Sequence, residues 1–393
     1  MELEYEYLLE LLGCYLTSRT PEKRSETNWQ QLMQLADIHS VTGILGYMNM
    51  KYQLCPDPVL SQTMRQMTMV TLSQFTQRGV WVEQFCKMLQ DAEIEHILLK
   101  GVIVRNYYPV PELRTFGDVD LVIHPDDRER SHQLMLDAGF QSKVDWGPVY
   151  SYYRGLEIYE IHTDIMEVEV SGKADYQGYF SGMWQYTMPR SGYTLEFKPE
   201  YHFLYMLTHI AKHVSDTGAG VRMYLDIGAF ILHFGDQVNW AWVEEELKGL
   251  KLWDFARVVF TAAECWFGVI CPLKYEKISH DVMEEFLVFT LEAGTFGHFQ
   301  RERVMSKLKK TGNDSSSSRW KLLFARMFPS AKTIEARYTY LQKMPWLLPV
   351  AWVHRLIITS AGFRKHAREA QVILSTDTIE VSQMHRLMRN IGL

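Results

Sequence analysis

The chain has 393 residues, of which 47% are hydrophobic and 22% charged, with 11 Trp, 21 Tyr and 19 Phe. This composition excludes a disordered or collagen-like chain, and the length predicts two or three structural units at roughly 100–200 residues per domain. Lys and Arg total 41 against 47 for Asp and Glu, a net charge of −6. This balance argues against a surface devoted to nucleic acid.

The cysteines and the N-terminus bear on the cellular compartment. The cysteines form no CxxC pair, and their odd number fits a reducing compartment better than a disulfide framework. We therefore expect core thiols at Cys14, Cys55, Cys86, Cys265 and Cys271. The N-terminus, MELEYE, lacks the basic segment and apolar run of a signal peptide. These features predict a cytoplasmic protein.

Residues 1–92 have helical periodicity and predict an N-terminal helical region. Apolar residues recur at spacings of three and four at Leu8, Leu11, Leu12 and Tyr15, and again at Trp29, Leu32 and Leu35. Thr20-Pro21 predicts a helix start, with an N-cap residue before Pro at the first helical position. A longer helix is predicted from Pro58 to Asp91, with its methionines as packing residues.

Residues 93–198 have the pattern of a small α/β unit. Strands are predicted over 97–99, 118–123 and 156–165, where apolar runs or alternation end at Gly or Pro. A helix is predicted from Asp126 to Ala138, closed by Gly139, and another over 102–107.

The remainder of the chain is predicted to be helical, with a domain over 199–310, a flexible polar loop over 311–319 and a C-terminal region over 320–393. The apolar stretch 345–363 contains Pro349, His354 and Arg355, which argues against a stable membrane span. It is either a buried helix with an aromatic face or a helix in contact with a membrane surface or a partner.

Asp118 and Asp120 are the most informative residues. A spacing of two in a strand sends both carboxylates to one face, while Val119, Leu121 and Ile123 take the other. Such a pair suits Mg²⁺, which prefers oxygen ligands and uses one or two protein carboxylates. The alternative is an exposed strand edge with two ordinary acids.

Two neighbouring segments support a phosphate site. Lys100-Gly101 ends the preceding strand with a positive charge and with a glycine that lets backbone amides approach a phosphate, although a plain strand-to-helix turn is the simpler reading. The third strand places Glu160, His162 and Asp164 on one face, with Tyr159, Ile161 and Ile165 on the other. One of the two acids is expected to complete a metal site or to take a proton from an attacking hydroxyl.

Together, Gly101, Asp118-Val-Asp120 and an acid on a following strand resemble the polymerase-β-type nucleotidyltransferase superfamily. Within it, the segments LLKG (98–101), RTFGDVD (114–120) and EIH (160–162) resemble a branch of uncharacterised bacterial nucleotidyltransferases, over about residues 90–235. The resemblance implies an α+β fold, in which a small mixed-sheet core is flanked by N-terminal and C-terminal helical regions.

The same resemblance implies a reaction and its ligands. A nucleotidyl group would pass from an NTP, bound with two Mg²⁺ or Mn²⁺ ions, to a hydroxyl-bearing acceptor, with release of pyrophosphate. Asp118 and Asp120 match the paired metal ligands, Glu160 the third acid, and His162 a histidine of this branch. The superfamily usually has Gly-Ser where this chain has Lys100-Gly101, so Lys100 is expected to replace the serine contact to the triphosphate.

Glu160 is preferred to Asp164 as the third acid. The apolar Ile158 suggests that this end of the strand lies deeper in the sheet, where a carboxylate needs the metals as partners. Asp164, near Glu167 and Glu169, has the simpler reading of a solvated strand end.

Arginines and histidines outside the acidic motifs extend the predicted site. Arg114 lies four residues before Asp118, and its planar fork suits a triphosphate, the alternative being a surface pair with Glu112 or Asp118. This branch also resembles other nucleotidyltransferases in an Arg-x-x-x-Asp helix, here Arg222 and Asp226, where Arg222 would contact nucleotide or acceptor. A helix salt bridge between these two residues is the alternative.

His209 and His213 share a helix face beside Lys212. The HExxH glutamate of zinc proteases is replaced by Ile210, so a zinc site is not favoured. We expect these three polar residues to border the cleft with His162 and Asp226, or His209 and His213 to be satisfied by hydrogen bonds in the core.

The leading hypothesis is a nucleotidyltransferase whose acceptor is a small molecule, peptide or saccharide rather than nucleic acid. The alternatives are a phosphotransferase at the same site, a non-catalytic nucleotide-binding or regulatory protein, and a membrane-surface scaffold that uses Trp346, Trp352 and Arg355. The scaffold would bind liposomes without Mg²⁺, and the retained acids argue against the regulatory protein. Neither of these last two explains Gly101 together with Asp118 and Asp120.

Overall fold

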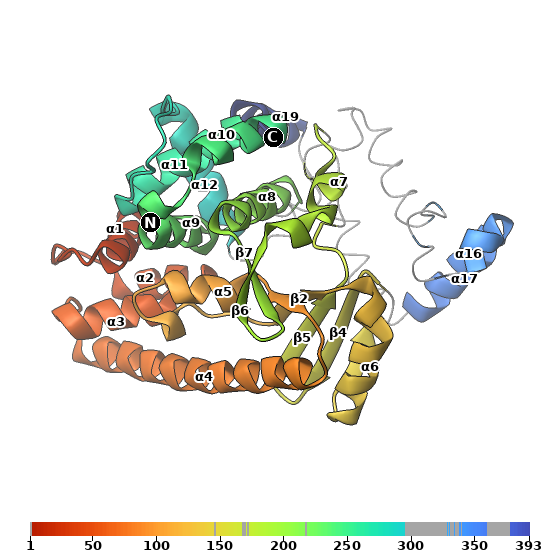
Figure 1. Cartoon of the computed structure of the whole chain (residues 1–393). Helices are drawn as coiled ribbons and strands as arrows, with labels where there is room; N and C mark the ends of the chain where they lie inside the picture. The colour runs from red at the N-terminus through yellow and green to blue at the C-terminus, as the bar shows by residue number, and fades with distance from the viewer. Residues whose placement is uncertain are drawn as a thin grey trace.

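The structure is a computed structural model of the whole chain (Figure 1). It describes residues 2–144, 147–166, 173–216, 218–294, 340–359 and 378–393, with the single residues 170, 328, 330, 334 and 338. The predicted loop at 311–319 lies outside the described residues, as do residues 360–363 of the apolar stretch.

The N-terminal region is helical, as predicted, and consists of α1 (Glu2–Thr17), α2 (Trp29–Ile38), α3 (Thr42–Tyr52) and α4 (Pro58–Asp91). Asp57 caps α4 by accepting hydrogen bonds from the backbone N–H groups of Val59 and Leu60. The predicted helix start at Thr20-Pro21 is wrong, because α2 begins at Trp29 behind the N-cap Asn28.

The segment after α1 is instead bound to that helix. The carbonyl of Glu22 accepts a hydrogen bond from Tyr7, and Arg24 pairs with Glu10 at 2.6 Å. Residues 19–28 are therefore not helical, and these contacts bind them to α1.

The sheet has seven strands in the order β3-β4-β5-β2-β1-β7-β6. Their bounds are β1 (His96–Leu98), β2 (Val119–Ile123), β3 (Gln141–Val144), β4 (Val149–Arg154), β5 (Glu157–His162), β6 (Thr187–Ser191) and β7 (Thr194–Phe197). Strands β2 and β5 are parallel, as are β1 and β7, and the other neighbouring pairs are antiparallel. The three predicted strands are therefore present within a mixed sheet, and four more were not predicted.

Two layers of helices cover the sheet, and Figure 1 shows α4 on one side of it and α8 and α9 on the other. Val119, Leu121 and Ile123 pack with α4 and with α6 (Arg128–Asp137) in one core, as the alternation predicted. Val122 belongs to the second core, on the side of the helical domain. The opposite face of β2 is therefore the face that carries Asp120.

Other short elements connect the sheet. They are α5 (Gly101–Val104), α7 (Tyr176–Ser181) and the 3-10 turns η1 (Arg105–Tyr107), η2 (Pro111–Leu113), η3 (Pro125–Asp127) and η4 (Met183–Tyr186). The helix predicted over 102–107 is thus one α-helical turn followed by a 3-10 turn. The helix predicted from Asp126 begins at Arg128, after η3, and Gly139 follows it with φ of +82°.

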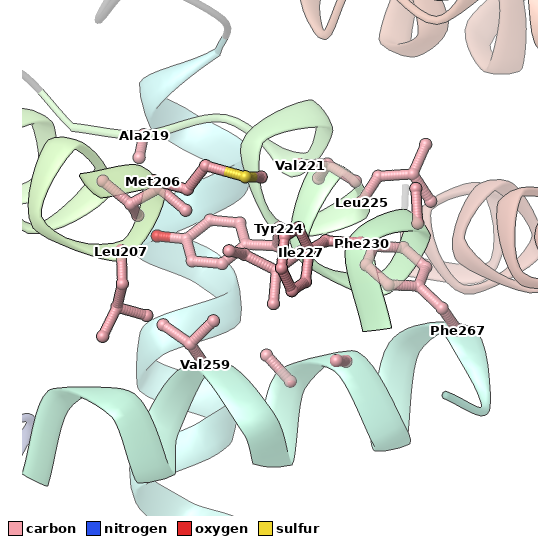
Figure 2. Close-up of a cluster of buried hydrophobic side chains, with 14 of the residues drawn as sticks. Met206, Leu207, Ala219, Val221, Tyr224, Leu225, Ile227, Phe230, Val259 and Phe267 are labelled. Atoms are coloured by element: carbon pink, nitrogen blue, oxygen red, sulfur yellow. The ribbon is translucent and has the colours of Figure 1, made fainter. Parts of the chain in front are cut away.

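The helical domain contains α8 (Pro199–Asp216), α9 (Val221–Phe234), η5 (Gly235–Gln237), α10 (Trp240–Gly249), α11 (Trp253–Phe267) and α12 (His280–Ala293). Figure 2 shows Leu207 of α8, Tyr224 and Ile227 of α9 and Val259 of α11 packed together. Leu8 and Leu12 of α1 belong to the same core. This shared core holds α8 and α9 rigidly against the sheet.

The described C-terminal elements are α16 (Tyr340–Lys343), η6 (Pro345–Leu347), α17 (Leu348–Thr359) and α19 (Thr378–Asn390). Trp346, Val350 and Val353 are 70%, 57% and 59% exposed, whereas Ala351 is buried, so the interpretation as a buried helix is wrong for these three exposed side chains. Among the described residues, no helix is both long and apolar enough to cross a membrane.

All five cysteines are free thiols. Cys14, Cys55 and Cys271 are buried, but Cys265 is exposed. The expectation of a core thiol is therefore wrong at Cys265, which belongs to the outer face of α11.

Candidate active site

Three adjacent strands bring the predicted acids together. The parallel register of β2 and β5 places Asp120 directly beside Glu160 and Val122 beside His162. The backbone N–H of Leu99 donates to the carbonyl of Asp120 at 2.9 Å. This hydrogen bond places the residues that follow β1 beside Asp120. Lys100, Asp120 and Glu160 therefore meet at one level of the sheet.

Asp120 is the centre of this group and is 3% exposed. Its Oδ1 lies 2.5 Å from Nζ of Lys100 and 3.1 Å from Nε2 of His162. Because an ionised carboxylate only accepts hydrogen bonds, the Nε2 of His162 must carry the hydrogen. Glu160 is adjacent, with its Oε2 4.0 Å from the same His162 nitrogen.

The acids of the group differ in electrostatic environment. Burial opposes ionisation of Asp120, but Lys100 and His162 outweigh it and hold the pKa of Asp120 below its usual value. Burial, followed by the charge of Asp120, raises the pKa of both Asp118 and Glu160. Asp120 is therefore the most firmly ionised of the three.

The arrangement fits a divalent cation. Ligand atoms of Asp120, Glu160 and His162 lie within 4.8 Å of one another. Carboxylate oxygens suit Mg²⁺, whereas Nε2 of His162 donates to Asp120, so His162 orients that ligand. Asp118 precedes the first residue of β2 and is not part of this compact group, but it lines the same cavity.

Lys100 has an unusual backbone. Its φ of 53° and ψ of −130° match the first central residue of a type II′ turn, a position that glycine dominates. A non-glycine residue held there costs of order 1–3 kcal/mol. The next residue has to be small, because a Cβ on Gly101 would lie 2.6 Å from Nη1 of Arg114 and 2.7 Å from Cβ of Phe116.

Arg114 and Asp226 form a buried ion pair between the loop before β2 and helix α9. Nε and Nη2 of Arg114 donate to the two oxygens of Asp226 at 3.0 and 2.6 Å, and the Tyr108 hydroxyl donates to Oδ1 at 2.6 Å. The alternative pairing of Arg114 with Glu112 is wrong, since Glu112 binds Arg105 at 3.3 Å. The predicted contact of Arg114 with a nucleotide stays a prediction.

Arg222 reaches the same loop from α9. Its Nη1 donates to the carbonyl and hydroxyl of Thr115 at 3.2 and 3.1 Å. Burial and the nearby charge of Arg114 lower the pKa of Arg222 to about 10, so the guanidinium remains charged at neutral pH.

His209 and His213 of α8 form a hydrogen-bonded pair, with their Nε2 atoms 3.1 Å apart. Burial lowers the pKa of both imidazoles, to about 4 for His213, and the charge of Lys212 contributes. Both rings are therefore neutral at pH 7. His209 and His213 line the cavity described below, whereas Lys212, also predicted to border the cleft, is not among its lining residues.

Most of the predicted site residues line one cavity of about 120 Å³, but Glu160, His162 and Lys212 are not among its lining residues. Asp120 of β2 lines the cavity, with Asp118 just before that strand and Lys100 and Gly101 just after β1. Helices α8 and α9 contribute His209, His213, Arg222 and Asp226, and the loop before β2 contributes Arg114. A larger cavity of about 640 Å³ lies beside α4 and contains none of the predicted site residues. The chemistry, rather than the size, identifies the site.

The surroundings of Asp164, Ile165 and Ile158 bear on the choice of third acid. Asp164 lies beyond the end of β5, and its carboxylate accepts hydrogen bonds from the Met166 backbone and from Gln177. Ile165 likewise lies past the strand and joins the second core. The argument from Ile158 is wrong, because that side chain is 44% exposed. The strand register is the observation that favours Glu160.

The sequence reasoning missed Tyr108, Thr115 and Tyr205. Tyr108 binds Asp226, Thr115 binds Arg222, and Tyr205 lines the cavity. Nothing in the local sequence marks Tyr108 or Tyr205. Thr115 lies in the RTFGDVD segment, but its partner Arg222 is 107 positions away.

Comparison with known proteins yields one match. A family model described as "uncharacterised nucleotidyltransferase" matches residues 25–268, which extends from α2 to α11 and contains every predicted site residue. No curated protein and no solved structure matches the chain. The matched stretch covers more than half of the chain and includes the acids, the cavity and the helices that close it, so the chain belongs to this family of uncharacterised nucleotidyltransferases.

Proposed function

We propose that the protein transfers a nucleotidyl group from an NTP to a hydroxyl-bearing acceptor, with Mg²⁺ or Mn²⁺ as the metal and pyrophosphate as the second product. The observation that carries this proposal is the register of Asp120 beside Glu160, because Asp120 lines a cavity that Arg222 also lines. The family supports nucleotidyl transfer in general.

The residues around the phosphates have two roles. Asp118, Asp120 and Glu160 hold the metal, which supplies charge stabilisation at the phosphates when bound. Lys100 and Arg222 bring positive charge to the triphosphate. A cavity of about 120 Å³ is smaller than the roughly 300–1,000 Å³ of typical ligand sites, so phosphates occupy it and the base and sugar extend through its open side.

The transfer follows from these positions. The acceptor oxygen attacks the α-phosphorus, a new P–O bond forms, and the bond from that phosphorus to the β-phosphate bridging oxygen breaks. Glu160 takes the acceptor proton, since Asp120 already accepts two hydrogen bonds at Oδ1 and burial raises the pKa of Glu160. The net charge of −6 favours a small molecule, peptide or saccharide acceptor over nucleic acid.

The test uses NTPs labelled at either end of the triphosphate. Each of the four α-³²P NTPs, and each γ-³²P NTP, is incubated with Mg²⁺ or Mn²⁺, the protein and a cell extract. Labelled acceptor is expected from the α-label, whereas the γ-label leaves in pyrophosphate, and acceptor labelling should be lost in Asp120→Asn and retained in the matched control Asp164→Asn. Product from the γ-label alone would establish the phosphotransferase instead. Absence of any product would favour a non-catalytic protein.

A further inference from the structure

One oxygen of Asp120 already has two polar partners. Nζ of Lys100 lies 2.5 Å and Nε2 of His162 lies 3.1 Å from Oδ1. Asp120 and Lys100 form an ion pair. Asp120 is 3% exposed, and the side chain of Lys100 is 27% exposed. The ammonium therefore occupies a cation position on the buried carboxylate.

A two-metal site needs a different arrangement of this carboxylate. Two ions about 3.5–4 Å apart are bridged when a shared carboxylate gives one oxygen to each. Asp120 is the only aspartate in the compact group with Glu160 among the described residues. With Oδ1 engaged by Lys100 and His162, Asp120 has only Oδ2 to offer a metal.

The backbone of Lys100 is the second observation. The residue keeps a φ of 53° and a ψ of −130°, in a turn that glycine would adopt without strain. Its carbonyl accepts hydrogen bonds from the backbone N–H groups of Ile103 and Val104 at 3.2 and 3.0 Å, which fixes this geometry. Strain of this kind persists where the surroundings over-determine it, and it clusters at functional sites. Here the strained residue is the one whose ammonium reaches Asp120.

We propose that the Lys100 ammonium takes the place of one of the two metal ions, so that the protein binds a single divalent ion with its nucleotide. The inference rests on the proposed function and refines the two-ion expectation. Asp120 Oδ2, Glu160 and Asp118 remain for the single ion. The Lys100 ammonium then supplies a positive charge between the carboxylates and the phosphates.

The test counts Mn²⁺ ions in the full-length protein. Wild type, Lys100→Ala and Lys100→Gly are saturated with Mn²⁺ and, in turn, with the α,β-methylene analogue of each NTP, whose carbon bridge blocks transfer. Bound Mn²⁺ per chain is measured by equilibrium dialysis, and the EPR line shape reports whether two ions are coupled. We expect one uncoupled ion in wild type and a twofold increase, to a coupled pair, in both variants.

The controls separate charge from backbone. Lys100→Ala removes the ammonium and keeps the strained φ, whereas Lys100→Gly removes both. Lys251→Gly is the matched control, because Lys251 is an exposed lysine that also has a positive φ, of 57°, outside the site. It should bind the same number of ions as wild type.

Each other outcome overturns the inference. A coupled pair in wild type means that Lys100 leaves Asp120 when metal arrives, which overturns the inference and leaves the proposed function standing. One ion in both Lys100 variants shows that the ammonium does not occupy a metal position. A wild type that retains neither Mn²⁺ nor any nucleotide overturns the proposed function as well.

Discussion

The buried pair of Arg114 and Asp226 allows a sharp test of how the site is built. It joins the loop before β2 to helix α9 across 112 positions of sequence. Asp226→Asn keeps the volume of the side chain but removes its charge, and it leaves the Arg114 guanidinium buried without a counter-ion. Its amide group also places a second donor against the donors of Arg114 or Tyr108.

The magnitude follows from burial and geometry. Arg114 and Asp226 are 8% and 6% exposed, and their two hydrogen bonds, at 3.0 and 2.6 Å, are charge-assisted. Removing one partner of such a buried pair costs roughly 3–5 kcal/mol. Because the amide oxygen still accepts one hydrogen bond, we expect Asp226→Asn to lower the free energy of unfolding by about 3 kcal/mol.

Urea unfolding, followed by the fluorescence of the 11 Trp and by far-UV circular dichroism, measures this change. Glu196→Gln is the matched control, because its pair with Arg190 is 3.2 Å long but 42% and 29% exposed. The control should lose less than about 1 kcal/mol. If Asp226→Asn is no more destabilising than Glu196→Gln, the pair does not hold the loop to α9.

Four further predictions concern the site. Asp120→Asn should retain helical circular dichroism but lose Mn²⁺ binding by calorimetry, and an unchanged affinity would remove Asp120 from the metal site. Glu160→Gln should lower turnover by roughly 10²–10⁴-fold with little change in nucleotide affinity, whereas Asp164→Asn should be nearly silent; the opposite ranking would make Asp164 the third acid. Lys100→Ala should weaken NTP binding more than NMP binding, and an equal loss would show that Lys100 does not contact the triphosphate. Burial lowers the pKa of His213 to about 4 from an ordinary 6.5, so the unfolded chain binds more protons between these pH values and stability falls as the pH falls. His213→Gln should reduce the loss of unfolding free energy between pH 8 and pH 5 by about 1–2 kcal/mol, allowing for partial exposure, and an unchanged loss would place the proton elsewhere.

The features that the sequence determined by itself depend on neighbours in the chain. Helix α4 follows from its apolar period and from the Asp57 cap with Pro58, and all of these act within a few residues. The alternation in β2 predicted that Val119 and Leu121 lie on one face of the strand and Asp120 on the other, because successive side chains of a strand point to opposite faces. Local rules therefore sufficed for helix α4 and for the face of β2 that carries Asp120.

The strands that were missed show where local rules end. β6 and β7 form a hairpin whose inner strand pairs with β1, about 100 positions earlier in the chain. Their sequences carry weak alternation, so the sheet partner rather than intrinsic propensity decides their conformation.

Only the tertiary structure decided which charges meet at the site. Lys100 and Asp120 are 20 positions apart, and Arg114 and Asp226 are 112 apart. Sequence spacing could therefore not show that Lys100 binds the Asp120 carboxylate or that Asp226 neutralises Arg114. Buried charges take whichever partner the packing brings within hydrogen-bond distance, because an unpaired ion is costly away from water. The packing of α9 against the sheet, and not the order of residues near Asp118, therefore set the electrostatics of this cavity.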